Sequence, residues 1–149
     1  MSASYRQVFY HIVFATKHRE PTIADAHCQE LYRFIWDVIR NRNCKLYQIN
    51  GVEDHLHLLV DLHPSVALAT LLRDIKSNSS FWMKESGMFP EFQGWQTGYG
   101  AFTCSFLEKN RIIGYIKKQK EHHRQESSAT ELKRLLNENG VPYEDTYFE

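Results

Sequence analysis

The chain has 149 residues, enough for one domain with a hydrophobic core. Acidic and basic residues number 18 each, which excludes a general polycation and confines any nucleic-acid site to a local patch. Cys28, Cys44 and Cys104 are odd in number and widely spaced, so neither a disulfide framework nor a zinc finger is indicated. No signal peptide or membrane-spanning apolar run is evident, which predicts a cytoplasmic protein.

The N-terminal half alternates strand and helix signals. Residues 8–16 are rich in aromatic and β-branched residues and predict a first strand, which a basic loop at residues 17–21 follows. Apolar residues recur at helical spacing over residues 25–41 and predict an amphipathic helix. Residues 46–52 and 56–62 predict a second and a third strand.

The turn between the second and third strands has two candidates. Asn50-Gly51 is a strong hairpin signal, whereas a turn at Glu53-Asp54 gives strands of better matched length. Both alternatives leave the histidines that follow on the third strand.

The C-terminal half contains three further helices and one strand. A second helix opens at Pro64-Ser65, with an inner stripe at Leu68, Leu71, Leu72, Ile75 and Trp82. We expect a loop at 83–94, a fourth strand at 95–105, a third helix at 108–124, and a shorter helix at 130–139 that ends at Gly140.

This order predicts an α+β fold. The first six elements follow the ferredoxin-like order β-α-β-β-α-β, which packs two helices on one face of an antiparallel sheet. We expect a single domain over residues 1–149, with a core at 5–105, the third helix at about 108–124 and a C-terminal tail at 125–149.

A pair of histidines stands in an apolar run, Asp54-His55-Leu56-His57-Leu58-Leu59-Val60. Because a strand alternates its faces, His55 and His57 point one way while Leu56, Leu58 and Val60 point the other. Two imidazoles on one face of an anchored strand are arranged to share a metal ion, although metal sites usually need a third protein ligand.

The predicted third helix contains the segment Tyr115-Ile116-Lys117-Lys118-Gln119, in which Gln119 is the candidate for that third ligand. A helix places Tyr115 and Gln119 one turn apart on one face. Acting as a nucleophile on a phosphodiester, Tyr115 would need activation, because the phenol has an ordinary pKa near 10. A divalent cation that polarises the scissile phosphate lowers the barrier to such an attack. Lys117 and Lys118 are candidate contacts to a phosphate backbone, as are Lys17 and Arg19 in the first loop.

Together, the element order, the His55-Leu56-His57 motif and the Tyr115-xxx-Gln119 motif resemble the single-tyrosine HUH transposases of bacterial insertion sequences. The resemblance includes the relatives associated with repetitive extragenic palindromes. It extends from Tyr10-His11-Ile12-Val13-Phe14 through the histidine motif to Gln119. The histidine motif alone is weakly specific, but the three features in this order are highly specific.

The resemblance implies roles for four residues. His55, His57 and Gln119 would be metal ligands, and Tyr115 the nucleophile that attacks single-stranded DNA and holds its 5′-phosphate covalently. It also implies a homodimer that recognises DNA hairpins. In several members of the family, the helix that carries the tyrosine in one subunit completes the histidine site of the other subunit.

The ligand chemistry and the competing functions complete the expectations. Two imidazoles, one amide oxygen and the oxygens of a DNA phosphate favour Mg²⁺ or Mn²⁺. The alternatives to a transposase are a domesticated protein that binds palindromic DNA without moving it, and a non-catalytic ferredoxin-like RNA-binding module that uses aromatic residues of the sheet for stacking.

Overall fold

The computed structural model describes residues 4–122 and 125–148. Its four strands are β1 (Phe9–Ala15), β2 (Lys45–Val52), β3 (His55–Asp61) and β4 (Gly100–Cys104). Its α-helices are α1 (Cys28–Asn41), α2 (Leu68–Ser86), α3 (Lys109–Lys117), α4 (Gln119–His122) and α5 (Ser128–Glu138). None of the helices in these described ranges is long and apolar enough to cross a membrane.

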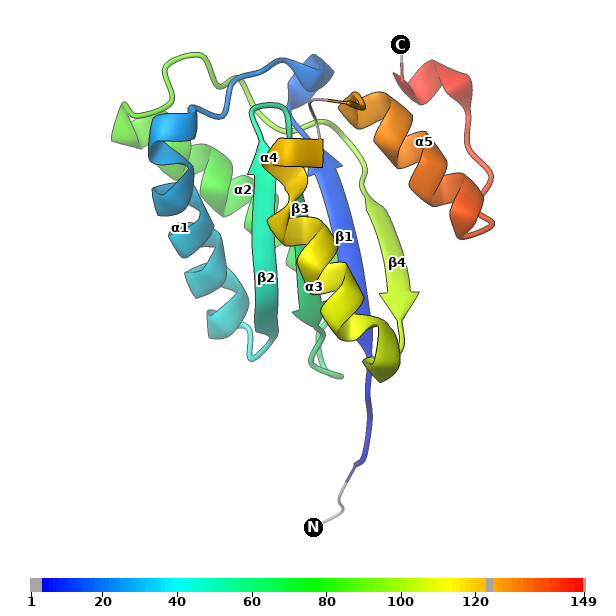
Figure 1. Ribbon diagram of the computed structural model, residues 1–149. Helices are drawn as coiled ribbons and strands as arrows, with labels where there is room; N and C mark the ends of the chain where they lie inside the picture. The colour runs from blue at the N-terminus through cyan, green and yellow to red at the C-terminus, as the bar shows by residue number, and fades with distance from the viewer. Residues whose placement is uncertain (1–3, 123–124, 149) are drawn as a thin grey trace.

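The strands form one antiparallel sheet in the order β2-β3-β1-β4 (Figure 1). The chain runs β1-α1-β2-β3-α2-β4 before it reaches the last three α-helices. The predicted α+β, ferredoxin-like fold is therefore confirmed.

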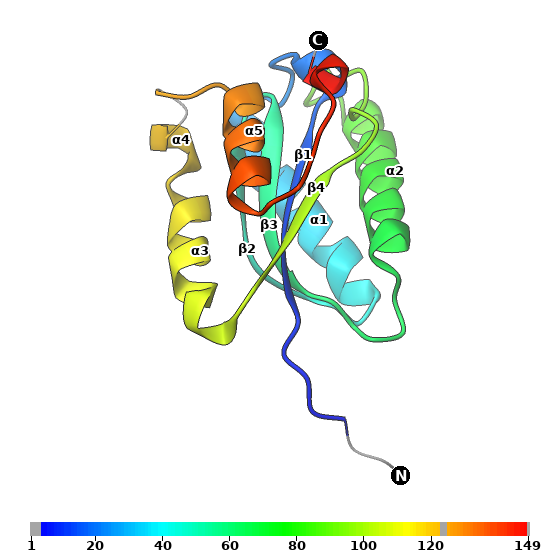
Figure 2. The same cartoon turned by 90° about the vertical axis from the view of Figure 1, so that its right-hand side faces the viewer.

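Helices cover both faces of the sheet. Figure 2 shows α1 and α2 on one side and α3, α4 and α5 on the other. The larger core lies between the sheet and α1 and α2, and its sheet residues are Ile12, Phe14, Leu56, Leu58 and Val60. Smaller apolar clusters lie on the opposite face, where Ile116 packs against Phe9 and Leu59, and three leucines of α5 pack against Val13 and Phe102. The second face is therefore closed by the C-terminal helices and not left open.

The β2–β3 hairpin turns at Glu53-Asp54, because Val52 pairs with His55 across the turn. Asn50-Gly51 is not the turn and lies within β2, where Gly51 pairs with Leu56. The Asn50 side chain instead donates hydrogen bonds to the carbonyl oxygens of Ile116 and Lys117 at 3.1 and 3.0 Å. These carbonyls lie at the C-terminal end of α3, the helix that carries Tyr115, so Asn50 joins the hairpin to this helix.

Several predicted boundaries change. Helix α2 starts at Leu68 and not at Pro64, and it continues to Ser86 through part of the predicted loop, because Ser79 and Met83 extend its buried stripe. Strand β4 starts only at Gly100, and Trp95 contributes an isolated bridge to Thr16.

The predicted third helix is interrupted. It breaks at Lys118 into α3 and α4, and its predicted end at residues 123–124 lies outside the described residues. The two motif residues of this segment are therefore divided, with Tyr115 in α3 and Gln119 at the first position of α4.

Candidate active site

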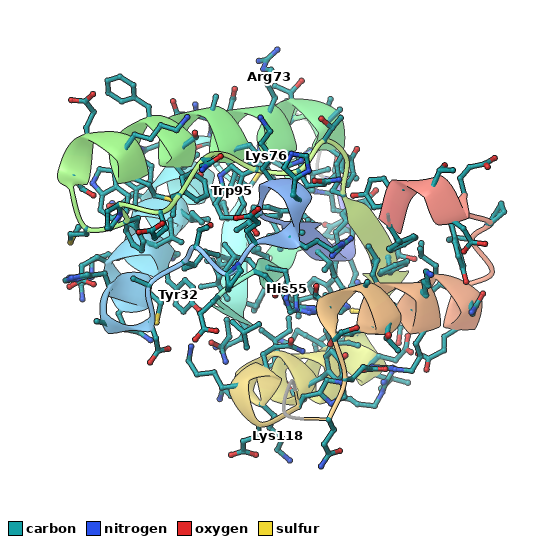
Figure 3. All side chains as sticks on the ribbon, turned by 90° about the horizontal axis from the view of Figure 1, so that it is seen from above. Tyr32, His55, Arg73, Lys76, Trp95 and Lys118 are labelled. Carbon is teal, nitrogen blue, oxygen red and sulfur yellow. The ribbon has the colours of Figure 1, made fainter. Side chains whose placement is uncertain are left out.

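The two histidines of β3 lie on the sheet face that the C-terminal helices cover. Figure 3 shows His55 on the side of α5 and α3, whereas Lys76 and Trp95 lie on the side of α2. His55 is 1% exposed and His57 is fully buried. The alternation of the strand, with Leu56 and Leu58 in the opposite core, fixes this orientation. The predicted shared face of the two imidazoles is confirmed.

Tyr115 lies beside His57, on the sheet face that the C-terminal helices cover. The ring centroids of Tyr115 and His57 are 5.8 Å apart. Gln119 is fully buried although a turn break separates it from α3. The structure thus brings together the four residues that the sequence motifs single out, and it does so within one chain.

Glu131 of α5 lies at the centre of this group. Its Oε1 atom is 3.0 Å from Nε2 of His55 and 2.8 Å from Nε2 of His57. Its Oε2 atom accepts hydrogen bonds from the Tyr115 hydroxyl and, at 3.0 Å, from Nε2 of Gln119. One carboxylate therefore contacts both histidines, the tyrosine and the glutamine.

A second carboxylate orients His55. Nδ1 of His55 lies 2.7 Å from Oδ1 of Asp54, and a carboxylate can only accept, so Nδ1 donates the hydrogen. Burial opposes protonation of His55, but the hydrogen bonds to Asp54 and Glu131 outweigh it and raise the pKa of His55 above its ordinary value. The other oxygen of Asp54 accepts a hydrogen bond from the Ser128 hydroxyl at 3.0 Å, which ties α5 to the hairpin.

A third histidine supports His57. Nε2 of His11, in β1, lies 2.9 Å from Nδ1 of His57, and both side chains are buried. Burial and the neighbouring His57 lower the pKa of His11 to about 3, so His11 is neutral at pH 7. His11 therefore fixes the ring of His57 without adding charge.

The Tyr115 hydroxyl lies between the carboxylate of Glu131 and the guanidinium of Arg134. It donates to Glu131 and accepts a hydrogen bond from Nη2 of Arg134 at 2.8 Å. Burial and Glu131 raise the pKa of Tyr115 above its ordinary value, and Arg134 partly offsets this rise. A cavity of about 230 Å³ lies between α3, β4 and α5, and its lining includes Tyr115, Arg134 and Arg111.

The site has the composition of a metal centre. His55, His57 and Glu131 form a group whose ligand atoms all lie within 4.8 Å of one another, and this group could hold a metal ion. In addition, Oε1 of Gln119 is buried and finds no hydrogen-bond partner among the described residues. An amide oxygen left in this state is a suitable ligand for a divalent cation.

The predicted DNA contacts lie around this centre in different settings. Lys17 is exposed in the loop after β1, and Lys117 and Lys118 are exposed at the break between α3 and α4. Arg19 is partly covered, because its guanidinium stacks on Tyr147 and Phe148 and donates to the Ser128 hydroxyl at 3.3 Å. Three of the four cations are thus open to a phosphate backbone.

The sequence motifs missed Glu131, His11 and Arg134. Two of them carry a weak signal, since His11 is a polar residue in an apolar strand and Glu131 directly precedes the apolar stripe of α5 at Leu132, Leu135 and Leu136. A polar residue at an inward-facing position usually has a hydrogen-bonding or charged partner, but the sequence pattern does not identify that partner.

The family comparison covers most of the chain. The model of the family described as "Transposase IS200 like" matches residues 4–119. The transposases of insertion sequence IS200 from Salmonella typhimurium and Salmonella typhi are each 28% identical over 123 residues, which cover 75% of this chain and 76% of theirs.

Two solved structures have the same fold. A crystal structure of a candidate transposase from Deinococcus radiodurans R1 has a TM-score of 0.62 at 23% identity, over 80% of this chain and 96% of that one. A REP-associated tyrosine transposase bound to a REP hairpin has a TM-score of 0.58 at 17% identity, over 83% of this chain and 74% of that one. The matched residues include both histidines, Tyr115 and Gln119, and the chain belongs to the family of IS200-like transposases.

Proposed function

We propose that this transposase cleaves and rejoins single-stranded DNA at hairpin-marked sites, through a covalent 5′-phosphotyrosine intermediate on Tyr115. The observation that carries the proposal is the convergence of Tyr115, His55, His57 and Gln119 in one enclosed site. An isolated structural tyrosine would not need a buried pair of imidazoles and an unpartnered amide oxygen beside it.

The chemistry is a phosphoryl transfer in two balanced steps. Tyr115 Oη attacks the phosphorus of a DNA phosphodiester, the bond from phosphorus to the 3′ oxygen breaks, and the 5′-phosphate stays on the tyrosine. The hydroxyl loses one proton and the departing 3′ oxygen gains one. Attack of a 3′-hydroxyl on the phosphotyrosine reverses these changes and joins the strands.

Side chains of this chain would support the steps. A divalent ion, Mg²⁺ or Mn²⁺, held by His55, His57 and Gln119 would supply Lewis-acid stabilisation of the charge on the phosphate. Arg134 directs a hydrogen-bond donor at the attacking oxygen, and the cavity beside Tyr115 gives a phosphate a route to it.

The substrate is inferred from the relatives and from the charge pattern. One relative of the same fold is bound to a REP hairpin. The overall charge of this chain is zero, so binding depends on local cations, of which Lys117 and Lys118 lie at the C-terminal end of α3. A single-stranded hairpin would offer both phosphates and unstacked bases.

Assembly as a homodimer is part of the proposal, and a mixing experiment decides whether Tyr115 works in its own subunit or in the partner. Tyr115 and His57 of one chain are neighbours, so a subunit exchange would require α3 to leave its own sheet. Mixing a Tyr115→Phe chain with a His55→Ala, His57→Ala chain tests the exchange. DNA attached to the histidine-deficient chain supports shared sites, and no attachment despite proven heterodimers contradicts them.

The covalent adduct tests the central proposal. Single-stranded oligonucleotides from the DNA that flanks the gene are incubated with the chain and Mn²⁺, and denaturing electrophoresis detects protein bound to labelled DNA. We expect an adduct with the unchanged chain and none with Tyr115→Phe, which keeps the ring but removes the nucleophilic oxygen. An adduct with Tyr115→Phe would reject Tyr115 as the nucleophile. Hairpin binding without any adduct would favour the domesticated DNA-binding alternative.

A further inference from the structure

We infer that Glu131 is a direct ligand of the metal, so that this chain supplies two imidazoles, a carboxylate and an amide oxygen to one ion. Glu131 lies beyond residues 4–119, the part that the family model matches, and it comes from α5. The inference rests on the metal site of the proposed function but not on the chemistry of Tyr115.

The position of the carboxylate is that of a shared ligand. Oε1 of Glu131 lies 3.0 and 2.8 Å from the Nε2 atoms of His55 and His57. Oε2 accepts from Gln119, whose own Oε1 is left without a hydrogen-bond partner among the residues described. An ion placed among these groups would meet a nitrogen from each histidine and an oxygen from each of the other two side chains.

The tautomer of His55 supports a cation at this point. Because Nδ1 of His55 faces Asp54, Nε2 is the ring nitrogen that faces the carboxylate oxygen of Glu131. Two electron-rich atoms 3.0 Å apart repel each other unless a cation lies between them. A divalent ion bound by both groups would fill this role. A histidine held by a carboxylate at Nδ1 is a recurring arrangement around metals.

Burial makes an incidental carboxylate at this position costly. The Glu131 side chain is 1% exposed, and an ionised carboxylate in such a place needs compensating charge. Helix α5 holds it there firmly, through Leu132, Leu135 and Leu136 on the sheet side and through Ser128 on Asp54. Glu131 is thus a fixed part of the site and not a surface acid that happens to approach it.

Metal binding by the full chain, measured without DNA, tests the inference. Free Mn²⁺ is followed by electron paramagnetic resonance during titration of the unchanged chain, of Glu131→Gln, and of Glu121→Gln as a control. Glu121 is an exposed acid on α4, two residues from Gln119, so its replacement removes the same charge outside the site. We expect Glu131→Gln to weaken Mn²⁺ binding at least 10-fold and Glu121→Gln to leave it unchanged.

The outcomes separate this inference from the proposed function. Equal Mn²⁺ affinity in the unchanged chain and in Glu131→Gln overturns this inference but leaves the proposed function intact. Glu131 would then be a buried residue that packs over the site without binding the metal. Failure of the unchanged chain to bind Mn²⁺ overturns the inference together with the metal requirement of the proposed function.

A second variant covers the case in which Glu131→Gln does not fold. Glu131→His exchanges an oxygen ligand for a nitrogen ligand, and Co²⁺ absorption reports the ligand set directly. A shift of the Co²⁺ bands in Glu131→His supports ligation by residue 131. Bands identical to those of the unchanged chain overturn it.

Discussion

Arg134 donates a hydrogen bond from Nη2 to the Oη of Tyr115 over 2.8 Å. The same nitrogen also donates to Oε1 of Glu126 at 3.0 Å, and Nη1 donates to Glu138 at 3.1 Å. The guanidinium is therefore held by two acids while one of its hydrogens points at the proposed nucleophile.

Loss of this donor should slow cleavage. A hydrogen bond from a charged donor contributes about 1.5–3 kcal/mol, which corresponds to roughly 10- to 100-fold in rate if it is needed in the transition state. We expect Arg134→Ala to slow adduct formation by this factor and Arg134→Lys to recover only part of it, because lysine lacks the planar fork. Single-turnover kinetics measure the rates, and Mn²⁺ titration serves as control. Rates equal to that of the unchanged chain would remove Arg134 from the mechanism.

Removal of a metal ligand should eliminate cleavage without loss of hairpin binding. His55→Ala and His57→Ala each remove one of the few proposed ligands, and we expect no adduct, whereas Gln119→Ala should weaken adduct formation strongly. A chelator should reproduce the effect on the unchanged chain, and added Mg²⁺ or Mn²⁺ should reverse it. Continued cleavage in excess chelator would contradict a metal-dependent reaction.

Single-stranded DNA that folds into a hairpin should bind more tightly than the matching duplex, and binding should weaken steeply with salt. We expect Lys117→Ala, Lys118→Ala to lower the slope of log affinity against log salt by about 1 for each phosphate that the variant no longer neutralises. Lys84→Ala is the control, since Lys84 is exposed on α2, on the other side of the sheet. Equal slopes for both variants, measured by fluorescence anisotropy, would exclude the two lysines from the DNA interface.

Gly51 should be indispensable for the hairpin that carries the histidines. A Cβ atom there would lie 2.2 Å from the carbonyl oxygen of His55 and 3.0 Å from the Cα of Leu56. Because backbone must move, we expect Gly51→Ala to lower the free energy of unfolding by about 2–3 kcal/mol.

Gly114→Ala is the matched control for that substitution. An added Cβ at Gly114 meets nothing within 4 Å, and alanine in a helix interior stabilises by roughly 0.5–1 kcal/mol. Urea unfolding measures both variants. A stable Gly51→Ala protein would show that the close approach of the two strands is not required.

Acid should destabilise the fold through His11. The pKa of His11 is about 3 in the folded chain, against 6.5 as its ordinary value. Between these values the unfolded chain binds the proton and the folded chain does not, so the contribution of His11 to stability is lost as the pH falls from about 6.5 toward 3. The slope for one such group approaches roughly 1.4 kcal/mol per pH unit.

The variant His11→Gln isolates this effect, because glutamine can still hydrogen-bond Nδ1 of His57 but does not titrate. Urea unfolding at several pH values between 7 and 4 should give a shallower dependence for His11→Gln than for the unchanged chain. Parallel curves would contradict a neutral, buried His11.

Local rules of chain geometry determined much of this protein from its sequence. The two-residue period of a strand placed His55 and His57 on one face and Leu56 and Leu58 in the core. Helical spacing predicted α1, α5 and the nearness of Tyr115 to Gln119. These features depend on neighbours a few residues apart, which a sequence pattern contains.

Tertiary packing decided the rest. The turn lies at Glu53-Asp54 because strand pairing across the sheet, and not the local preference of Asn50-Gly51, sets the register. The break at Lys118 and the burial of Gln119 follow from the docking of α3 and α4 onto the hairpin, where Asn50 binds the last carbonyls of α3. Glu131 meets His55 across 76 positions of sequence, and only the packing of α5 on the second face of the sheet brings that carboxylate to the imidazoles.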